Sequence, residues 1–68
     1  MSRLAIIAAP SPDHVPLWFV DGERATRKQA AEVLRQEGLD LFWFYEKHAL
    51  RVSEEDWEEY ERLFPLPD

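Results

Sequence analysis

LFWFY, residues 41–45, is the stretch of this 68-residue chain that decides its fold. Five consecutive large apolar or aromatic residues are a composition favoured in β-strands. As a strand, Leu41, Trp43 and Tyr45 would share one face, with Phe42 and Phe44 on the other. Both faces would then be apolar, which predicts a central strand that is covered on both sides, followed by a return strand over 49–52.

The N-terminal quarter contains a short apolar run and three prolines. Leu4–Ala9 is apolar and ends at Pro10, which is typical of a buried strand or of an arm packed on the core. Pro10, Pro12 and Pro16 fix their own φ angles and disfavour helix at the residue before them, so 11–15 is expected to be an extended connector. Residues 1–16 are therefore predicted to be a strand or arm followed by a proline-rich connector.

A β-hairpin is predicted immediately after this connector. Leu17–Val20 is an apolar run, and Asp21-Gly22 follows it. Both residues of an Asp-Gly pair can adopt the positive φ angles of a tight hairpin turn. Glu23–Ala25 would then form the short return strand.

The next segment has the signals of a helix at both ends. Thr26 and Gln29 have the spacing of a capping box, and Ala30, Val33 and Leu34 form a narrow apolar stripe. A glycine, residue 38, follows and can adopt the left-handed conformation that ends helices. We expect a helix over 26–37.

A second helix is expected over 53–64. Ser53 can cap it, and Trp57, Tyr60 and Phe64 recur at helical spacing as a buried stripe. Pro65 ends the helix, and 65–68 would be an extended tail. The remaining positions give this helix a polyanionic outer surface, made by Glu54, Glu55, Glu58, Glu59 and Glu61.

These elements predict an α+β fold, in one small domain over residues 1–68. It would hold three or four short antiparallel strands and two helices. The chain has no cysteine, which excludes disulfides and thiolate zinc sites, so hydrophobic packing must stabilise it. Its longest apolar run is too short to cross a bilayer, and we expect a soluble cytoplasmic protein, for example one acting in the host cell of a phage.

The negative charge is concentrated at one end of the chain. The formal net charge is −6, yet residues 1–52 contain seven acidic and seven basic side chains. Residues 53–68 contain seven acids against Arg62 alone, so the whole excess lies there. Such a field repels phosphate backbones and attracts basic surfaces. The charge therefore argues against direct nucleic-acid binding by the C-terminal helix and favours a basic protein partner.

Part of the chain is similar to a known family. Residues 29–34 followed by Gly38, then 43–50, then 53–56, resemble the DNA-binding half of mercury-resistance-type regulators and of excisionases. The resemblance covers about 35 residues and implies a winged helix-turn-helix, mainly α-helical, with a helix over 39–47. Two features depart from the family: Arg51 and Val52 leave no room for a wing, and residues 39–42 at the recognition positions are poorly suited to phosphate. The resemblance implies at most a degenerate helix-turn-helix or dimerisation module.

No catalytic or cofactor motif is present in the sequence. Two histidines without metal-ligand spacing do not predict a metal site, and the two glycines cannot form a phosphate-binding loop. Acid pairs on an exposed helix lack the environment that tunes a pKa for catalysis. We expect no enzyme activity, no cofactor and no metal.

The sequence thus favours a non-enzymatic interaction protein. Nine aromatic residues exceed what a thin core can cover, so some should be exposed and could anchor a contact. The partner-binding residues predicted are Glu54, Glu55, Glu58, Glu59, Glu61, Trp43 and Tyr45. The expected partner is a larger protein with a basic surface, such as a nuclease or polymerase complex, blocked in the style of a phage anti-CRISPR.

Two alternatives stay open. The first is the degenerate helix-turn-helix module, including a homodimer. The second is a direct nucleic-acid binder that would use four basic residues, Arg24, Arg27, Lys28 and Arg35. Neither a membrane segment nor a basic groove is predicted.

Overall fold

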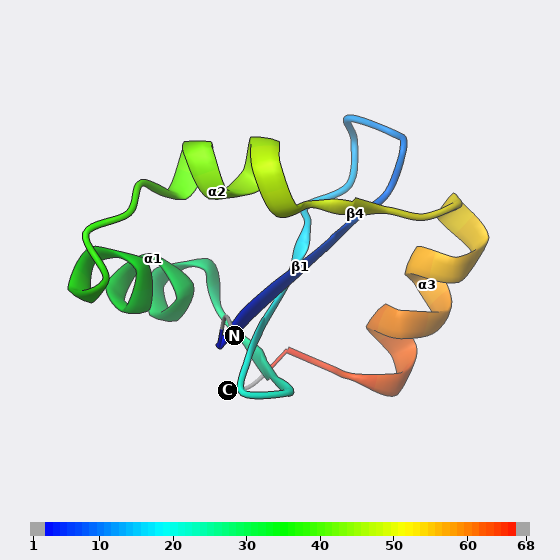
Figure 1. Cartoon of the computed structure of the whole chain (residues 1–68). Helices are drawn as coiled ribbons and strands as arrows, with labels where there is room; N and C mark the ends of the chain where they lie inside the picture. The colour runs from blue at the N-terminus through cyan, green and yellow to red at the C-terminus, as the bar shows by residue number, and fades with distance from the viewer. Residues whose placement is uncertain (1–2, 67–68) are drawn as a thin grey trace.

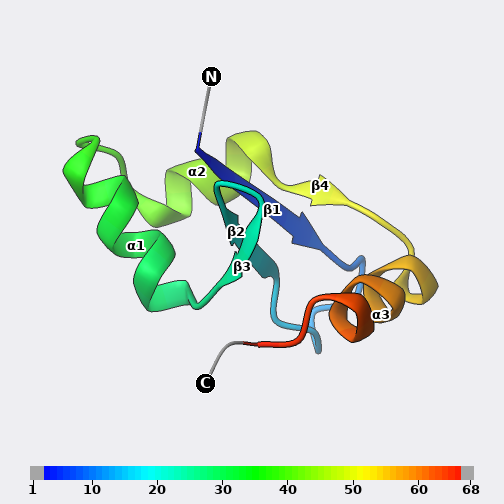
Figure 2. The ribbon, with the colours of Figure 1, turned by 90° about the horizontal axis from the view of Figure 1, so that it is seen from below.

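The computed structural model describes residues 3–66 and shows an α+β domain with seven elements. A four-stranded sheet lies between two helices on one face and a third helix on the other (Figures 1 and 2). The strands are β1 (Leu4–Ala8), β2 (Leu17–Val20), β3 (Glu23–Ala25) and β4 (Leu50–Arg51). The helices are α1 (Arg27–Gln36), α2 (Leu41–His48) and α3 (Glu54–Leu63).

The sheet has the strand order β3-β2-β1-β4, with β1 in the interior. β1 pairs antiparallel with β2, and β2 pairs antiparallel with β3, as predicted. The turn between β2 and β3 has φ angles of 52° at Asp21 and 82° at Gly22, the positive values that a tight hairpin turn requires. The Arg3 guanidinium donates to the Asp21 carboxylate at 3.1 Å, and this hydrogen bond and charge raise the pKa of Arg3.

Each face of the sheet has its own hydrophobic cluster, because successive strand residues point to opposite faces. Leu4, Ile6 and Trp18 face α1 and α2, where they pack with Ala30, Leu34 and Phe44. Leu17 and Phe19 face α3, where they pack with Ala9 and Trp57. The helices that the sequence predicts over 26–37 and 53–64 are confirmed as α1 and α3.

The cap of α1 is the capping box predicted from the sequence. The Thr26 hydroxyl accepts from the Gln29 amide at 3.1 Å, and the Gln29 side chain accepts from the Thr26 amide at 2.9 Å. At the other end, Gly38 has a φ of 75° and ends the helix as expected. The capping box thus provides acceptors for the Thr26 and Gln29 backbone amides, which an isolated helix would leave unpaired.

The strand predicted for 41–45 is wrong, because this segment is the first part of α2. Asp40 caps the helix, its carboxylate accepting from the Trp43 amide at 3.1 Å. Helical spacing buries Phe44 at 2% exposure and turns Phe42 outward at 68% exposure. The physical reason is that α1 and α3 already cover the two faces of the sheet, so a further strand with two apolar faces has no place. The structure therefore has three helices.

The return strand predicted over 49–52 is present only as the two residues of β4. It pairs with β1 in parallel, through Ile7 opposite Leu50 and Ala8 opposite Arg51, so the sheet is mixed and not wholly antiparallel. The Val52 amide also donates to the Ala8 carbonyl at 2.9 Å. The strand is parallel because α2 carries the chain back across the sheet before β4 begins.

The proline-rich connector forms a turn, and the prediction of an extended segment is wrong. The His14 amide donates to the Ser11 carbonyl at 3.4 Å, and the Asp13 amide donates to the Ser11 hydroxyl at 3.2 Å. Pro12 stands at the second position of this turn, where its fixed φ is favourable. The loop therefore folds back on the domain.

The mainly α-helical alternative is also wrong, since a four-stranded sheet forms the centre of the domain. That alternative did predict a helix over 39–47, and α2 occupies this segment. Between residues 3 and 66, no helix is long and apolar enough to cross a membrane. Residues 67 and 68 of the predicted tail lie outside the described residues.

Candidate partner-binding surface

The acidic side chains predicted as a binding surface lie on α3. Its first turn is capped by Ser53, whose hydroxyl accepts from the Asp56 amide at 3.1 Å. Trp57 faces the sheet and is 5% exposed, and Tyr60 is half-buried beside it. Because Trp57 and Tyr60 pack on the sheet, the remaining residues of α3 face solvent.

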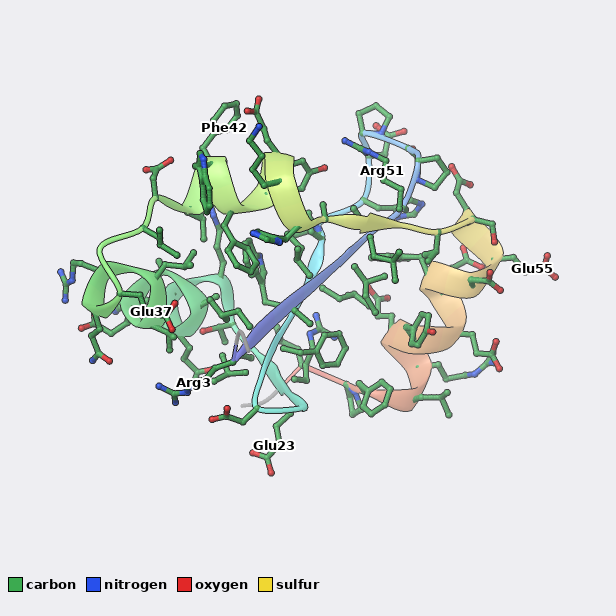
Figure 3. The ribbon with its side chains drawn as sticks, in the orientation of Figure 1. Arg3, Glu23, Glu37, Phe42, Arg51 and Glu55 are labelled. Atoms are coloured by element: carbon green, nitrogen blue, oxygen red, sulfur yellow. The ribbon has the colours of Figure 1, made fainter. Side chains whose placement is uncertain are left out.

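The opposite side of α3 carries the five predicted glutamates, and all of them are exposed: Glu54, Glu55, Glu58, Glu59 and Glu61. We call these residues the acidic face. In Figure 3 the Glu55 side chain points outward from the helix, away from the sheet. Residues four apart on a helix are separated by about 6 Å along its axis, so the carboxylates form rows of regular spacing. The ion pairs found among residues 3–66, Arg3–Asp21 and Arg35–Glu32, do not involve the acidic face.

Part of the acidic face works against helix stability. Glu54 and Glu55 lie in the first turn, where the helix macrodipole favours anions. Glu58, Glu59 and Glu61 lie after the first turn, beyond the reach of that favourable field. Residues of like charge three or four apart also repel one another, each such pair by about 0.2–0.5 kcal/mol. Arg62, three residues after Glu59 and four after Glu58, offsets only part of this repulsion. Local helix chemistry therefore does not explain these three glutamates.

The two aromatic residues predicted as anchors are on the other side of the domain from α3. Trp43 and Tyr45 belong to α2, which packs on the sheet face opposite to α3. Trp43 is 42% exposed and Tyr45 is half-buried, with the Arg51 guanidinium 5.7 Å from its ring centre. The structure therefore does not bring this pair together with the acidic face.

Exposed apolar residues do lie at the C-terminal end of α3, and the sequence analysis did not single them out as anchors. Leu63 is 62% exposed, and Phe64 and Leu66 are also exposed. The Phe64 ring contacts Phe19 edge-on, with centroids 5.4 Å apart, so its position is fixed by the core. For Leu63 the sequence does contain a signal, because its helical position differs from that of Trp57 and Tyr60, which pack on the sheet. A partner on the acidic face could reach these apolar groups.

The four basic residues of the nucleic-acid alternative do not form one patch. Arg35 pairs with Glu32, whose hydrogen bond and charge raise the pKa of Arg35. Arg24 is half-buried and donates to the Phe64 carbonyl at 2.7 Å. Arg27 and Lys28 are exposed at the start of α1, about 12 Å along the helix axis from Arg35. A continuous phosphate-binding stripe is therefore not formed by these side chains.

A second feature, which the sequence analysis missed, is a pocket beside α3. It has a volume of about 730 Å³ and lies between the proline-rich loop, β3 and the C-terminal end of α3. Trp57 and Arg24 contribute to its lining, and the His14 ring packs against Trp57 with centroids 4.4 Å apart and planes tilted by 36°. No local pattern predicts this pocket, because it depends on three segments that are distant in the sequence.

Comparison with family models, with curated proteins and with solved structures gave no significant match.

Proposed function

We propose that this chain is an interaction protein without catalytic activity, whose acidic face occupies a positively charged surface of a larger protein that handles nucleic acid. The occupied surface would be one that normally binds phosphates. In effect the chain would act as an inhibitor or regulator, in the style of the small acidic inhibitors made by phages. The single observation that supports this is the acidic face itself, five exposed carboxylates with no counter-ion among the described residues.

The electrostatic argument has two parts. Glu58, Glu59 and Glu61 lower helix stability, so their presence suggests a benefit outside folding. Complementary charge mainly accelerates encounter and fixes orientation, while buried apolar contacts slow dissociation. Leu63, at the end of the same helix, and Leu66, just after it, are the apolar groups placed to supply such contacts.

The experiment compares two variants with the same net charge. The test variant carries Glu58→Gln, Glu59→Gln and Glu61→Gln on the acidic face. The matched control carries Glu23→Gln, Glu37→Gln and Glu46→Gln, three exposed carboxylates on β3, after α1 and on α2. Circular dichroism first establishes that both variants fold.

Each immobilised variant is then used to capture proteins from the native host, and the binding of a captured protein is measured at increasing salt. We expect the wild-type and control chains to bind it alike and the test variant to bind at least about tenfold more weakly. A DNA or RNA fragment should compete with the wild-type chain for the same protein. Equal binding by both variants, or an absence of competition by nucleic acid, would contradict the proposal.

A further inference from the structure

Two residues that line the pocket beside α3 carry buried hydrogen-bond donors without acceptors. The Trp57 indole Nε1 and the Arg24 Nε are both inaccessible to solvent, and neither has a hydrogen-bond partner among the described residues. Both residues line the same pocket of about 730 Å³. A buried donor without an acceptor is destabilising, most strongly when it belongs to a charged group. A ligand that supplies a hydrogen-bond acceptor to these donors would therefore bind favourably.

The Arg24 side chain is held so that one part of its guanidinium is occupied and another part is not. Its Nη1 donates to the Phe64 carbonyl at 2.7 Å, which ties β3 to the end of α3. Its Nε is left for a second acceptor. A carboxylate is the acceptor that matches an arginine edge best, because it is charged and presents two oxygens.

Several other residues of the lining indicate that the part of the ligand beyond the carboxylate is apolar. Val15 and Pro16 from the loop, and Pro65 and Leu66 from the segment after α3, contribute apolar groups. A pocket with apolar walls and a few convergent donors is typical of sites for small organic ligands. Its volume lies within the range of such sites.

Two carboxylates, Asp13 and Glu61, also line the pocket and would repel an anion. Both side chains are exposed, whereas the two donors are buried. Water and salt therefore screen the repulsion more strongly than the attraction at Arg24. Arg27, which is exposed and also in the lining, adds a second positive charge.

The proline-rich loop provides a way in. The hydrogen bonds found for residues 11–14 are internal to this loop, from the amides of Asp13 and His14 to Ser11. The ring contact found between this loop and the domain is that of His14 with Trp57, whose planes are tilted by 36°. A ligand that displaces His14 would approach the Trp57 indole without unfolding any strand or helix, and Arg24 lines the same pocket.

We propose that this pocket binds the carboxylate of an apolar monocarboxylic acid, with Arg24 Nε and Trp57 Nε1 as donors. The acid is either a small hydrocarbon or aromatic acid or the C-terminal residue of a peptide. This site adjoins the acidic face, because Glu61 belongs to that face and also lines the pocket.

The test is a titration followed by NMR of the tryptophan indole and arginine Nε N–H signals. The probes are phenylacetate, its neutral analogue phenylacetamide, acetyl-alanyl-leucine and the C-terminal amide of that dipeptide. We expect the Trp57 and Arg24 signals to shift with saturation on adding an acid, and each amide to bind about tenfold more weakly than its acid. The acid that binds more tightly identifies the source as a small molecule or a peptide end.

Variants test the roles of the residues. Arg24→Lys keeps the charge but removes the Nε donor together with the Nη1 donor to the Phe64 carbonyl, so circular dichroism first establishes that it folds. Trp57→Phe keeps an aromatic ring but removes the indole N–H. Each should weaken binding about tenfold. Glu61→Gln is exposed and should leave the fold intact while tightening binding about two- to threefold. Three results would overturn the proposal. The first is that neither acid shifts the signals, and the second is that an acid and its amide bind equally well. The third is that the two single variants Glu61→Gln and Arg24→Lys both bind with the affinity of the wild-type chain.

Discussion

Two adjacent phenylalanines provide a sharp test of the helix over residues 41–48. Phe44 is 2% exposed and packs between Trp18 and His48, with ring centroids 6.2 Å and 4.6 Å away. Phe42 is 68% exposed and, in Figure 3, points away from the domain. In a helix these residues are about 200° apart, whereas in a strand they share one face.

The expected free-energy changes differ strongly. Phe44→Ala removes a buried ring and should destabilise the domain by about 3–5 kcal/mol. A domain of this size has a total stability of about 3–10 kcal/mol, so the variant should be largely unfolded at the lower end of that range. Phe44→Leu is the measurable substitute, with an expected loss of about 1–1.5 kcal/mol. Phe42→Ala should change stability by less than about 0.5 kcal/mol.

The assay is urea unfolding followed by far-ultraviolet circular dichroism and by tryptophan fluorescence, since Trp18 lies next to Phe44. The midpoint should fall for Phe44→Leu and stay close to wild type for Phe42→Ala, with unchanged slopes. A loss for Phe42→Ala as large as that for Phe44→Leu, or larger, would show that both rings share one buried face. That result would refute the helix and restore the strand.

Three further changes should have smaller and separate effects. Gly22→Ala should lower the unfolding free energy by about 1 kcal/mol, measured by urea unfolding, because its φ of 82° is strained for alanine although no atom obstructs the methyl group. Thr26→Ala should lose about 0.5–2 kcal/mol in the same assay, since it removes the hydroxyl that caps Gln29; an unchanged midpoint would mean that the capping box is not formed in solution. Glu61→Lys should raise Tm by about 2–4 °C at low salt, because it replaces repulsion from Glu58 by attraction and suits the end of the helix. The gain should shrink at high salt, and a Tm that falls at low salt would contradict the analysis of the acidic face.

The sequence predicts those elements whose signals are local. Asp21-Gly22 specifies a turn through backbone conformation, and Thr26 with Gln29 specifies a helix start through two hydrogen bonds. The α+β class, the hairpin and the helices α1 and α3 follow from such signals. Of the buried stripe predicted on the last helix, Trp57 was placed correctly, because its spacing to Tyr60 is helical. Phe64 was predicted in the same stripe but is exposed, since it lies just after the helix ends.

Residues 41–45 could not be assigned in this way, because both interpretations fit five apolar residues. The choice depends on what else covers the sheet, which is a property of the whole domain. Asp40 was the overlooked local signal, since an aspartate before an apolar run can cap a helix. The acidic face was predictable from charge and spacing, but its distance from Trp43 was not. That distance follows from the course of α2 and β4 around the sheet.

The interior position of β1 has a consequence for the order of assembly during synthesis. β1 leaves the ribosome first, and β2 and β3 can join it as soon as they emerge. Its other edge can pair only when Leu50 and Arg51 have emerged, more than forty residues later. Closing such a long loop costs entropy, which slows this pairing. Until α3 has also emerged, the face that it covers is bare, so Leu17 and Phe19 stay accessible to chaperones and proteases on the nascent chain.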